Sequence, residues 1–130
     1  MIADTNFVSD LLKERGRKLR GPALEFFAAH RSDNIRVSII TIGELAPWFR
    51  FSPEVWPAMK RWTIYRLHDG IVNAAADVDR ELTKAGRRLG ENDNWIAGFC
   101  RYYRMPVLSR DLDFDRVPGL RRVHYGPPPA

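Results

Sequence analysis

The chain has 130 residues, of which 45% are hydrophobic and 12% are aromatic, so it suits a single domain with a packed core and excludes a largely disordered polypeptide. Lys and Arg number 21 against 16 Asp and Glu, which gives a net charge of +5, and 17 of the basic residues are Arg. The guanidinium group of Arg binds phosphate through two hydrogen bonds, which Lys cannot do, and a basic surface attracts polyanions. A GC-rich genome that favours Arg codons explains the excess of Arg equally well.

Several kinds of site are excluded by the count or position of single residue types. Cys100 is the only cysteine, which excludes an internal disulfide and a Cys-based zinc site and fits a cytoplasmic protein in a reducing compartment. The three histidines have no spacing typical of a zinc enzyme. We expect no signal peptide, because Asp4 interrupts the first apolar segment, and no membrane partner, because no apolar run approaches about 18 residues.

The hydrophobic pattern over the first 30 residues predicts one strand and two helices. A short strand at 1–3 is followed by a helix at 6–14, whose apolar residues recur at helical spacing. Residues 13–20 form a basic connector. Pro22 suits the first turn of a second helix, expected at 23–30.

The middle of the chain is predicted to contain a strand at 35–40 and then a helix. Thr41 and Glu44 match the capping box that opens a helix, and Pro47 should kink or break that helix early. A further helix is expected at 53–62. The elements expected beyond it are a strand at 63–67, a helix at 71–85, a basic loop at 86–90, a helix at 92–103, and strands at 106–108 and 121–125.

Strands that alternate with helices favour an α/β fold of three layers, with a central parallel sheet of about five short strands flanked by helices. No internal repeat and no interdomain linker is visible. We therefore expect one domain over residues 1–125, followed by a disordered Pro-rich tail at 126–130.

Four carboxylates, Asp4, Glu44, Asp93 and Asp111, each follow an apolar run where a helix or turn is expected to begin. In a parallel sheet the carboxyl ends of neighbouring strands converge on one crevice, so these side chains are expected to meet. Four acids in one crevice repel one another unless a hard divalent cation lies between them, and oxygen ligands suit Mg²⁺ or Mn²⁺.

Each acid also has a purely structural interpretation. Asp4 can cap the first helix, and Glu44 can be the reciprocal partner of Thr41 in the capping box. Asp93 suits the positive end of a helix dipole, and Asp111 suits a turn. These roles explain one carboxylate at a time. They do not explain an acid at all four junctions, so the set as a whole favours a metal site.

Four sequence blocks resemble the signature blocks of PIN domains, and VapC-like toxins of toxin–antitoxin pairs are the most similar subgroup. The blocks are Asp4-Thr5-Asn6, Thr41-Ile42-Gly43-Glu44-Leu45, Asn92-Asp93-Asn94-Trp95-Ile96-Ala97-Gly98, and the segment from Ser109 to Leu120. They occur in order, at normal spacing, over essentially the whole chain. The opening block is weak alone, whereas the four together are specific.

The resemblance implies a PIN-like fold and a Mg²⁺- or Mn²⁺-dependent endoribonuclease that hydrolyses RNA and is held inactive by a VapB-type antitoxin. It implies an acidic catalytic and metal-binding quartet made of Asp4, Glu44, Asp93 and Asp111. Asp113 is an auxiliary metal ligand in this pattern. The polar positions that orient the acids or a metal-bound water are Thr5, Asn6 and Ser109.

Two basic segments are hypothesised to contact RNA phosphates, with solvated loops as the alternative. The residues concerned are Arg15, Arg17, Lys18, Arg20, Arg87 and Arg88. The aromatic residues near Trp48 can stack on unpaired bases or pack in an interface. Together with the resemblance, the apolar 45–62 stretch predicts a homodimer, with the antitoxin laid along a groove near Trp48, Phe49 and Phe51.

Other functions remain open at this point. A phosphoacceptor receiver-like domain also places acids at strand ends, but it requires a Lys after a late strand, and Val107-Leu108-Ser109-Arg110 has none. A catalytically silent PIN-like module that binds only RNA or protein is a second alternative. A housekeeping PIN nuclease without an antitoxin is a third.

Overall fold

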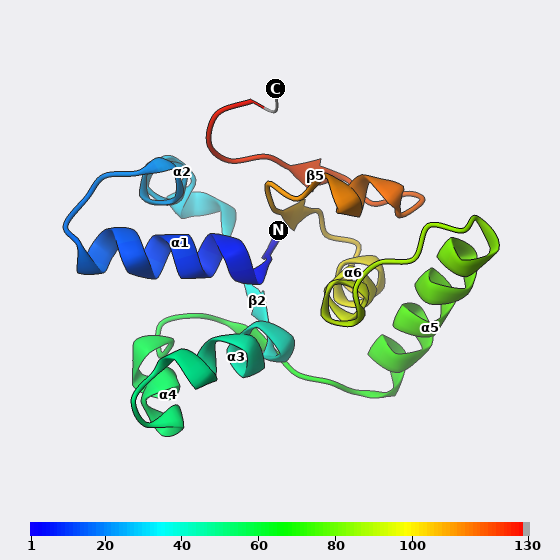
Figure 1. Cartoon of the computed structure of the whole chain (residues 1–130), viewed down its shortest axis with the longest axis horizontal. Coiled ribbons are helices and arrows are strands. Elements are labelled where there is room, and N and C mark those ends of the chain that lie inside the picture. The colour runs from blue at the N-terminus through cyan, green and yellow to red at the C-terminus, as the bar shows by residue number, and fades with distance from the viewer. Residues whose placement is uncertain (129–130) are drawn as a thin grey trace.

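Short parallel strands form the centre of the computed structural model, which describes residues 1–128 of the chain (Figure 1). Two hydrogen-bonded residues make up each strand. Within the described range the strands are β1 (Ile2–Ala3), β2 (Val37–Ser38), β3 (Ile64–Tyr65), β4 (Val107–Leu108) and β5 (Arg122–Val123).

All the strand pairs are parallel. β4 lies between β1 and β5, and β2 pairs separately with β3. An isolated parallel bridge between Ile2 and Arg36 joins the two groups, and the Ala3 N–H donates to the Arg36 carbonyl at 2.8 Å. The strands therefore follow the spatial order β3-β2-β1-β4-β5, with β1 in the middle.

Helices cover both faces of this sheet, and in Figure 1 α1 and α2 lie to one side of the strands while α5 and α6 lie to the other. The α-helices among residues 1–128 are α1 (Thr5–Gly16), α2 (Pro22–Ala29), α3 (Ile39–Leu45), α4 (Val55–Ala58), α5 (Asp69–Lys84) and α6 (Glu91–Tyr103). The 3₁₀ turns are η1 (Arg31–Asp33), η2 (Ala46–Trp48), η3 (Ser52–Glu54) and η4 (Leu112–Arg116).

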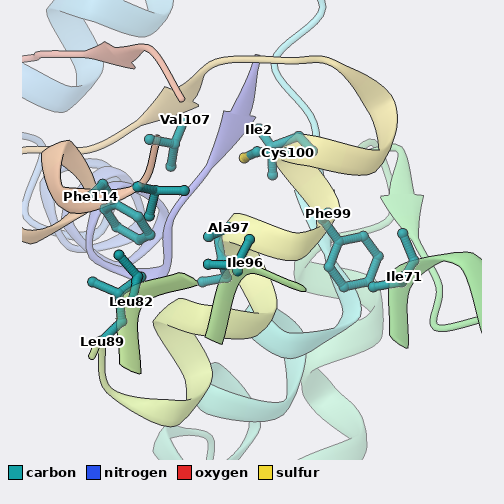
Figure 2. Close-up of a cluster of buried hydrophobic side chains, with 12 residues drawn as sticks. Ile2, Ile71, Leu82, Leu89, Ile96, Ala97, Phe99, Cys100, Val107 and Phe114 are labelled. Atoms are coloured by element: carbon teal, nitrogen blue, oxygen red, sulfur yellow. The ribbon is translucent and has the colours of Figure 1, made fainter. Parts of the chain in front are cut away.

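Two hydrophobic cores lie on opposite faces of the sheet because successive residues of a strand point to opposite faces. Ile2 and Val107 belong to the core that α5 and α6 cover, which Figure 2 shows. Ala3 and Leu108, the next residues along the same strands, belong to the core beneath α1. The expected three-layer α/β fold is therefore confirmed.

The lone cysteine lies in the first of these cores (Figure 2). Burial raises the pKa of the Cys100 thiol to about 12, so the thiolate form that a nucleophile requires is not available near neutral pH. Among residues 1–128, no helix combines the length and hydrophobicity needed to cross a membrane.

The start of α3 differs from its expected position. The predicted strand at 35–40 contributes only Val37–Ser38, and the helix begins at Ile39 instead of at Thr41. Thr41 is buried inside the helix and does not cap it, so the capping-box prediction is wrong. The apolar pattern did not distinguish a strand from a buried helix here, because both bury consecutive Ile residues. The helix does end early near Pro47, as predicted: α3 stops at Leu45, and Pro47 lies in the 3₁₀ turn η2 that follows.

The predicted helix at 53–62 is also mostly wrong. Only η3 and the four-residue α4 form there, because Pro57 lacks the backbone N–H that a longer helix would require. The remaining elements match their predictions to within a few residues; α1 extends to Gly16 and so includes the start of the expected basic connector. Residues 129–130 of the expected Pro-rich tail lie outside the described residues, so disorder at 126–130 stays a prediction.

Candidate active site

Asp4 lies where the central strand β1 meets α1, and only 3% of its surface is exposed. One carboxylate oxygen, Oδ1, accepts the Phe7 N–H at 2.9 Å and so caps the helix. The other, Oδ2, accepts the hydroxyl proton of Ser109, which follows β4. The predicted capping role of Asp4 is therefore real, and it leaves the carboxylate at the carboxyl end of the central strand.

Ser109 connects Asp4 to the acids that follow β4. Its Oγ accepts a hydrogen bond from the Asp111 N–H at 2.9 Å, and its hydroxyl group donates a hydrogen bond to Asp4. Asp111 in turn opens η4, because its Oδ1 accepts the Asp113 N–H at 2.9 Å. Asp113 itself is half exposed and forms an ion pair with Arg116 at 3.1 Å.

Glu44 reaches the same region from α3. The Thr5 hydroxyl donates to Glu44 Oε1 at 2.6 Å, and the Thr5 and Thr41 hydroxyl oxygens lie 3.1 Å apart. Glu44 thus pairs with a residue 39 positions away in the sequence, in place of the neighbouring Thr41 that the capping box implied. Thr41 belongs to this polar contact, a role that the sequence alone did not indicate.

Burial raises the pKa of Asp4 to about 6, and the negative charges of Asp111 and Asp10 add to this rise. The hydrogen bonds from Ser109 and Phe7 oppose it, because they stabilise the carboxylate. The burial effect is the larger one.

Asp93 lies in the first turn of α6, and its pKa is also raised to about 6. Burial is the main cause, and the negative charges of Asp111, Asp4 and Glu44 add to it. Acids from three other parts of the sequence therefore act electrostatically on Asp93.

A cleft of about 510 Å³ opens among these acids. Its lining residues are Asp4, Thr5, Asn6, Glu44, Trp48 and Asp93. Asp111, Asp113 and Ser109 do not line it. They are linked to Asp4 through the hydrogen bonds of Ser109 and Asp111.

The donor set fits a hard divalent cation, because carboxylate oxygens are the ligands that Mg²⁺ and Mn²⁺ prefer. The raised pKa values of Asp4 and Asp93 fit it as well, since a cation would offset the burial and repulsion that disfavour their charged forms. As the side chains are placed over residues 1–128, however, no three of the His, Cys, Asp or Glu groups are close enough together to hold one ion. Binding an ion with three of these carboxylates therefore requires their side chains to move inward.

The basic residues hypothesised to contact RNA do not line the cleft, and they lie in two separate places. The connector with Arg15, Arg17 and Lys18 is at the far end of α1, about 16 Å from its first turn at 1.5 Å per residue. The loop with Arg87 and Arg88 lies between α5 and α6, on the other side of the molecule (Figure 1).

Some of these basic side chains already have partners within the chain. Arg88 forms an ion pair with Asp79 at 2.9 Å, and the guanidinium of Arg15 lies 5.0 Å from the Phe27 ring centroid. For Arg17, Lys18, Arg20 and Arg87, no ion pair is found within residues 1–128.

Arg122 is a supporting residue that the sequence analysis missed. Its guanidinium Nη1 donates to the Ser109 carbonyl at 3.0 Å, and its Nε donates to Asp115 at 3.0 Å. Only 11% of its side chain is exposed. A charged residue inside the predicted strand at 121–125 was the available signal, because a buried Arg requires hydrogen-bonding partners.

Comparison with known proteins gives two findings. A model of the PIN domain family matches residues 1–120. No match is found among curated proteins.

Solved structures with similar folds include three VapBC complexes. VapBC2 from Rickettsia felis, bound to a DNA fragment from its promoter, has a TM-score of 0.80 and 16% identity, and the match covers 96% of this chain and 98% of that chain. DNA-bound VapBC from Salmonella typhimurium has a TM-score of 0.78, 22% identity, and coverage of 95% and 96%. VapBC-1 from nontypeable Haemophilus influenzae has a TM-score of 0.75, 24% identity, and coverage of 95% and 96%. At these identities the likeness shows the fold.

Proposed function

The chain belongs to the PIN domain family, and from this premise we propose that it is a divalent-metal-dependent endoribonuclease and the toxin of a VapBC-type toxin–antitoxin pair. The observation that carries this proposal is the convergence of Asp4, Glu44 and Asp93 on one cleft, with Asp111 coupled to Asp4 through Ser109. Structural neighbours that are themselves toxin–antitoxin complexes support the second half.

The acids of the cleft need a cation before they can act on RNA, because a phosphodiester is itself anionic. Asp4, Glu44, Asp93 and Asp111 would hold Mg²⁺ or Mn²⁺, with Asp113 as an auxiliary ligand. When bound, the ion supplies positive charge for the scissile phosphate and lowers the pKa of a bound water. Water attacks in line, and the family resemblance implies products with a 5′-phosphate and a 3′-hydroxyl.

The hydroxyl groups of the site orient its carboxylates. Ser109 donates a hydrogen bond to Asp4, and Thr5 donates a hydrogen bond to Glu44, so each hydroxyl fixes the rotation of one acid. Because each carboxylate oxygen has two acceptor positions, these contacts leave acceptor capacity free for a cation. Asn6 lines the cleft with an exposed amide, which we assign to orienting water or substrate.

The antitoxin is proposed to lie in an apolar groove beside the cleft. The groove has a volume of about 190 Å³ and is lined by Ser9, Leu12, Lys13, Leu45, Trp48 and Phe49. Trp48 and Phe51 are 61% and 60% exposed, which is unusual for side chains of this size. An extended or helical peptide with apolar anchors would cover them.

Asparagine substitutions test the nuclease proposal. We expect Asp4→Asn, Asp93→Asn and Asp111→Asn each to lower Mn²⁺-dependent RNA cleavage by orders of magnitude, because each removes a charge that the cation requires. The melting temperature should hold or rise for Asp93→Asn, because repulsion among the metal-free acids is relieved. Cleavage and melting temperature are measured side by side.

Asp77→Asn is the matched control, because Asp77 forms an exposed ion pair with Arg80 and does not line the cleft. It should leave both cleavage and melting temperature nearly unchanged. Near-normal cleavage in all three cleft variants, or full wild-type cleavage in excess EDTA, would refute the metal-nuclease proposal. A titration that detects no Mn²⁺ binding would favour the catalytically silent alternative.

A further inference from the structure

Trp48 is the one large apolar side chain in the lining of the acid cleft. The other lining residues are polar or acidic: Asp4, Thr5, Asn6, Glu44 and Asp93. Trp48 is 61% exposed and ends η2, four residues after Glu44. Its indole is therefore a flat contact surface directly beside the group of acids.

The two sides of Trp48 face different surroundings, because it lines both the acid cleft and the apolar groove. Lys13 lines only the groove, and its ammonium nitrogen lies 4.9 Å from the centroid of the Trp48 ring. Lys13 does not line the acid cleft. Because Trp48 is 61% exposed and lines the acid cleft, part of its indole is open to a ligand there.

A ligand that uses this surface must combine a flat apolar group with a nearby negative charge that the cation site can accept. An unpaired nucleotide has both, because its base has a π-face and its phosphate is attached to the same sugar. A base inside a duplex is already stacked between its neighbours and cannot present that face.

We propose that Trp48 forms a stacking subsite for one unpaired nucleobase immediately beside the scissile phosphate. This inference rests on the proposed nuclease function. It assigns a substrate contact to a residue outside the acidic quartet that lines both the cleft and the groove.

The test uses a single-stranded RNA oligonucleotide that the wild-type protein cleaves in Mn²⁺, together with versions that carry one abasic nucleotide at each position around the cleaved bond. In the wild type, one position should raise KM by roughly 5- to 100-fold, the range expected when one stacked base is removed. In Trp48→Ala the intact oligonucleotide should show the same increase in KM. The abasic substitution at that position should then raise KM no further, because the two changes remove the same interaction.

Trp56→Ala is the matched control. Trp56 is 45% exposed and has the guanidinium of Arg66 5.8 Å from its ring centroid, but it does not line the cleft. This variant should keep the wild-type response to every abasic position. A Trp48→Phe variant, which keeps a smaller ring, should retain part of the response.

The outcomes separate the two proposals. If the wild type cleaves the RNA but Trp48→Ala keeps the wild-type KM and abasic response, the stacking subsite is refuted while the nuclease proposal stands. Trp48 then belongs only to the groove for a protein partner. If the wild type cleaves none of the oligonucleotides in Mn²⁺, the nuclease proposal fails and the subsite fails with it.

Discussion

At the scale of single residues, the site depends on hydroxyl groups that each bind a carboxylate from a distant part of the chain. Ser109 contacts Asp4 across 105 positions of sequence, and Thr5 contacts Glu44 across 39. The hydrogen bond from Ser109 stabilises the charged form of Asp4, yet burial still raises the pKa of Asp4 to about 6. In the absence of a metal ion, ionisation of Asp4 therefore lowers the stability of the folded protein.

The stability of the metal-free protein should consequently depend on pH in a defined direction. Asp4 and Asp93 have a pKa of about 6 in the folded protein, against about 4 in an unfolded chain. The folded state binds these protons more tightly than the unfolded chain does. The contribution of the two acids to the free energy of unfolding therefore falls as pH rises from about 4 to about 6 and then levels off. Melting temperatures measured in EDTA across this range give the slope.

Asp93→Asn isolates this effect from the other carboxylates, many of which form ion pairs and act in the opposite direction. The melting temperature of the variant minus that of the wild type should increase between about pH 4 and pH 6, because the variant has no charge to bury. A difference that stays flat over this range would show that Asp93 is not destabilised by ionisation.

At the scale of elements, the position of Asp93 depends on how α6 packs against α5. Gly98 lies one and a half turns after Asp93 on α6, and a Cβ at this position would lie 2.7 Å from the Ala75 Cβ and 2.9 Å from its Cα. The two helices therefore approach closely at this point. Asn94 adds a hydrogen bond from its side chain to the Ala75 carbonyl at 2.9 Å.

Gly98→Ala should destabilise the protein by about 1–3 kcal/mol, because the added methyl group forces α5 and α6 apart. Gly43→Ala in α3 is the matched control, since a Cβ there meets nothing within 4 Å. That change should stabilise the protein by about 0.5–1 kcal/mol through higher helix propensity. Chemical denaturation measures both, and equal effects of the two substitutions would contradict the close approach of the helices.

The basic connector after α1 makes a second prediction at the scale of elements. Arg15, Arg17 and Lys18 can bind the phosphates of an RNA strand that extends along α1 from the cleft. In that case, replacing all three with Gln should lower the affinity for RNA and make the binding constant less dependent on salt concentration. The slope of log K against log salt should become shallower by about 2, because each neutralised phosphate of a single strand adds roughly 0.7 to the slope. An unchanged slope would identify the connector as a solvated loop.

At the scale of the whole molecule, exposed aromatic side chains point to assembly. Within residues 1–128, Trp48, Phe51 and Trp56 remain 45–61% exposed along the segment between α3 and β3, and apolar surface of this kind is typical of interaction sites. We expect a symmetric homodimer that also binds the antitoxin at the groove beside Trp48.

Light scattering tests this prediction directly. The molar mass should correspond to two chains at tens of micromolar and should increase when a cognate antitoxin is added. The double variant Phe51→Ser/Trp56→Ser, which leaves the cleft lining intact, should weaken the assembly while keeping cleavage activity. A wild-type chain that stays monomeric at this concentration and gains no mass with antitoxin would contradict the prediction.

The amino-acid sequence by itself was sufficient for the fold class, the parallel strands and the family. Each of these depends on a local pattern: apolar runs, helical spacing, and an acid at the end of a run. Local signals also placed Asp4 at a helix start and ended α3 at Pro47.

Only the tertiary structure decided how the acids are held. The sequence paired Glu44 with Thr41 through a capping box, whereas the fold pairs Glu44 with Thr5 because β1 and β2 bring α1 and α3 together. It likewise gave no indication that Arg122 supports Ser109, or that Trp48 lines the acid cleft. The reason is physical: local propensities reflect neighbours along the chain, whereas hydrogen bonds and burial in a site depend on residues that only folding brings into contact.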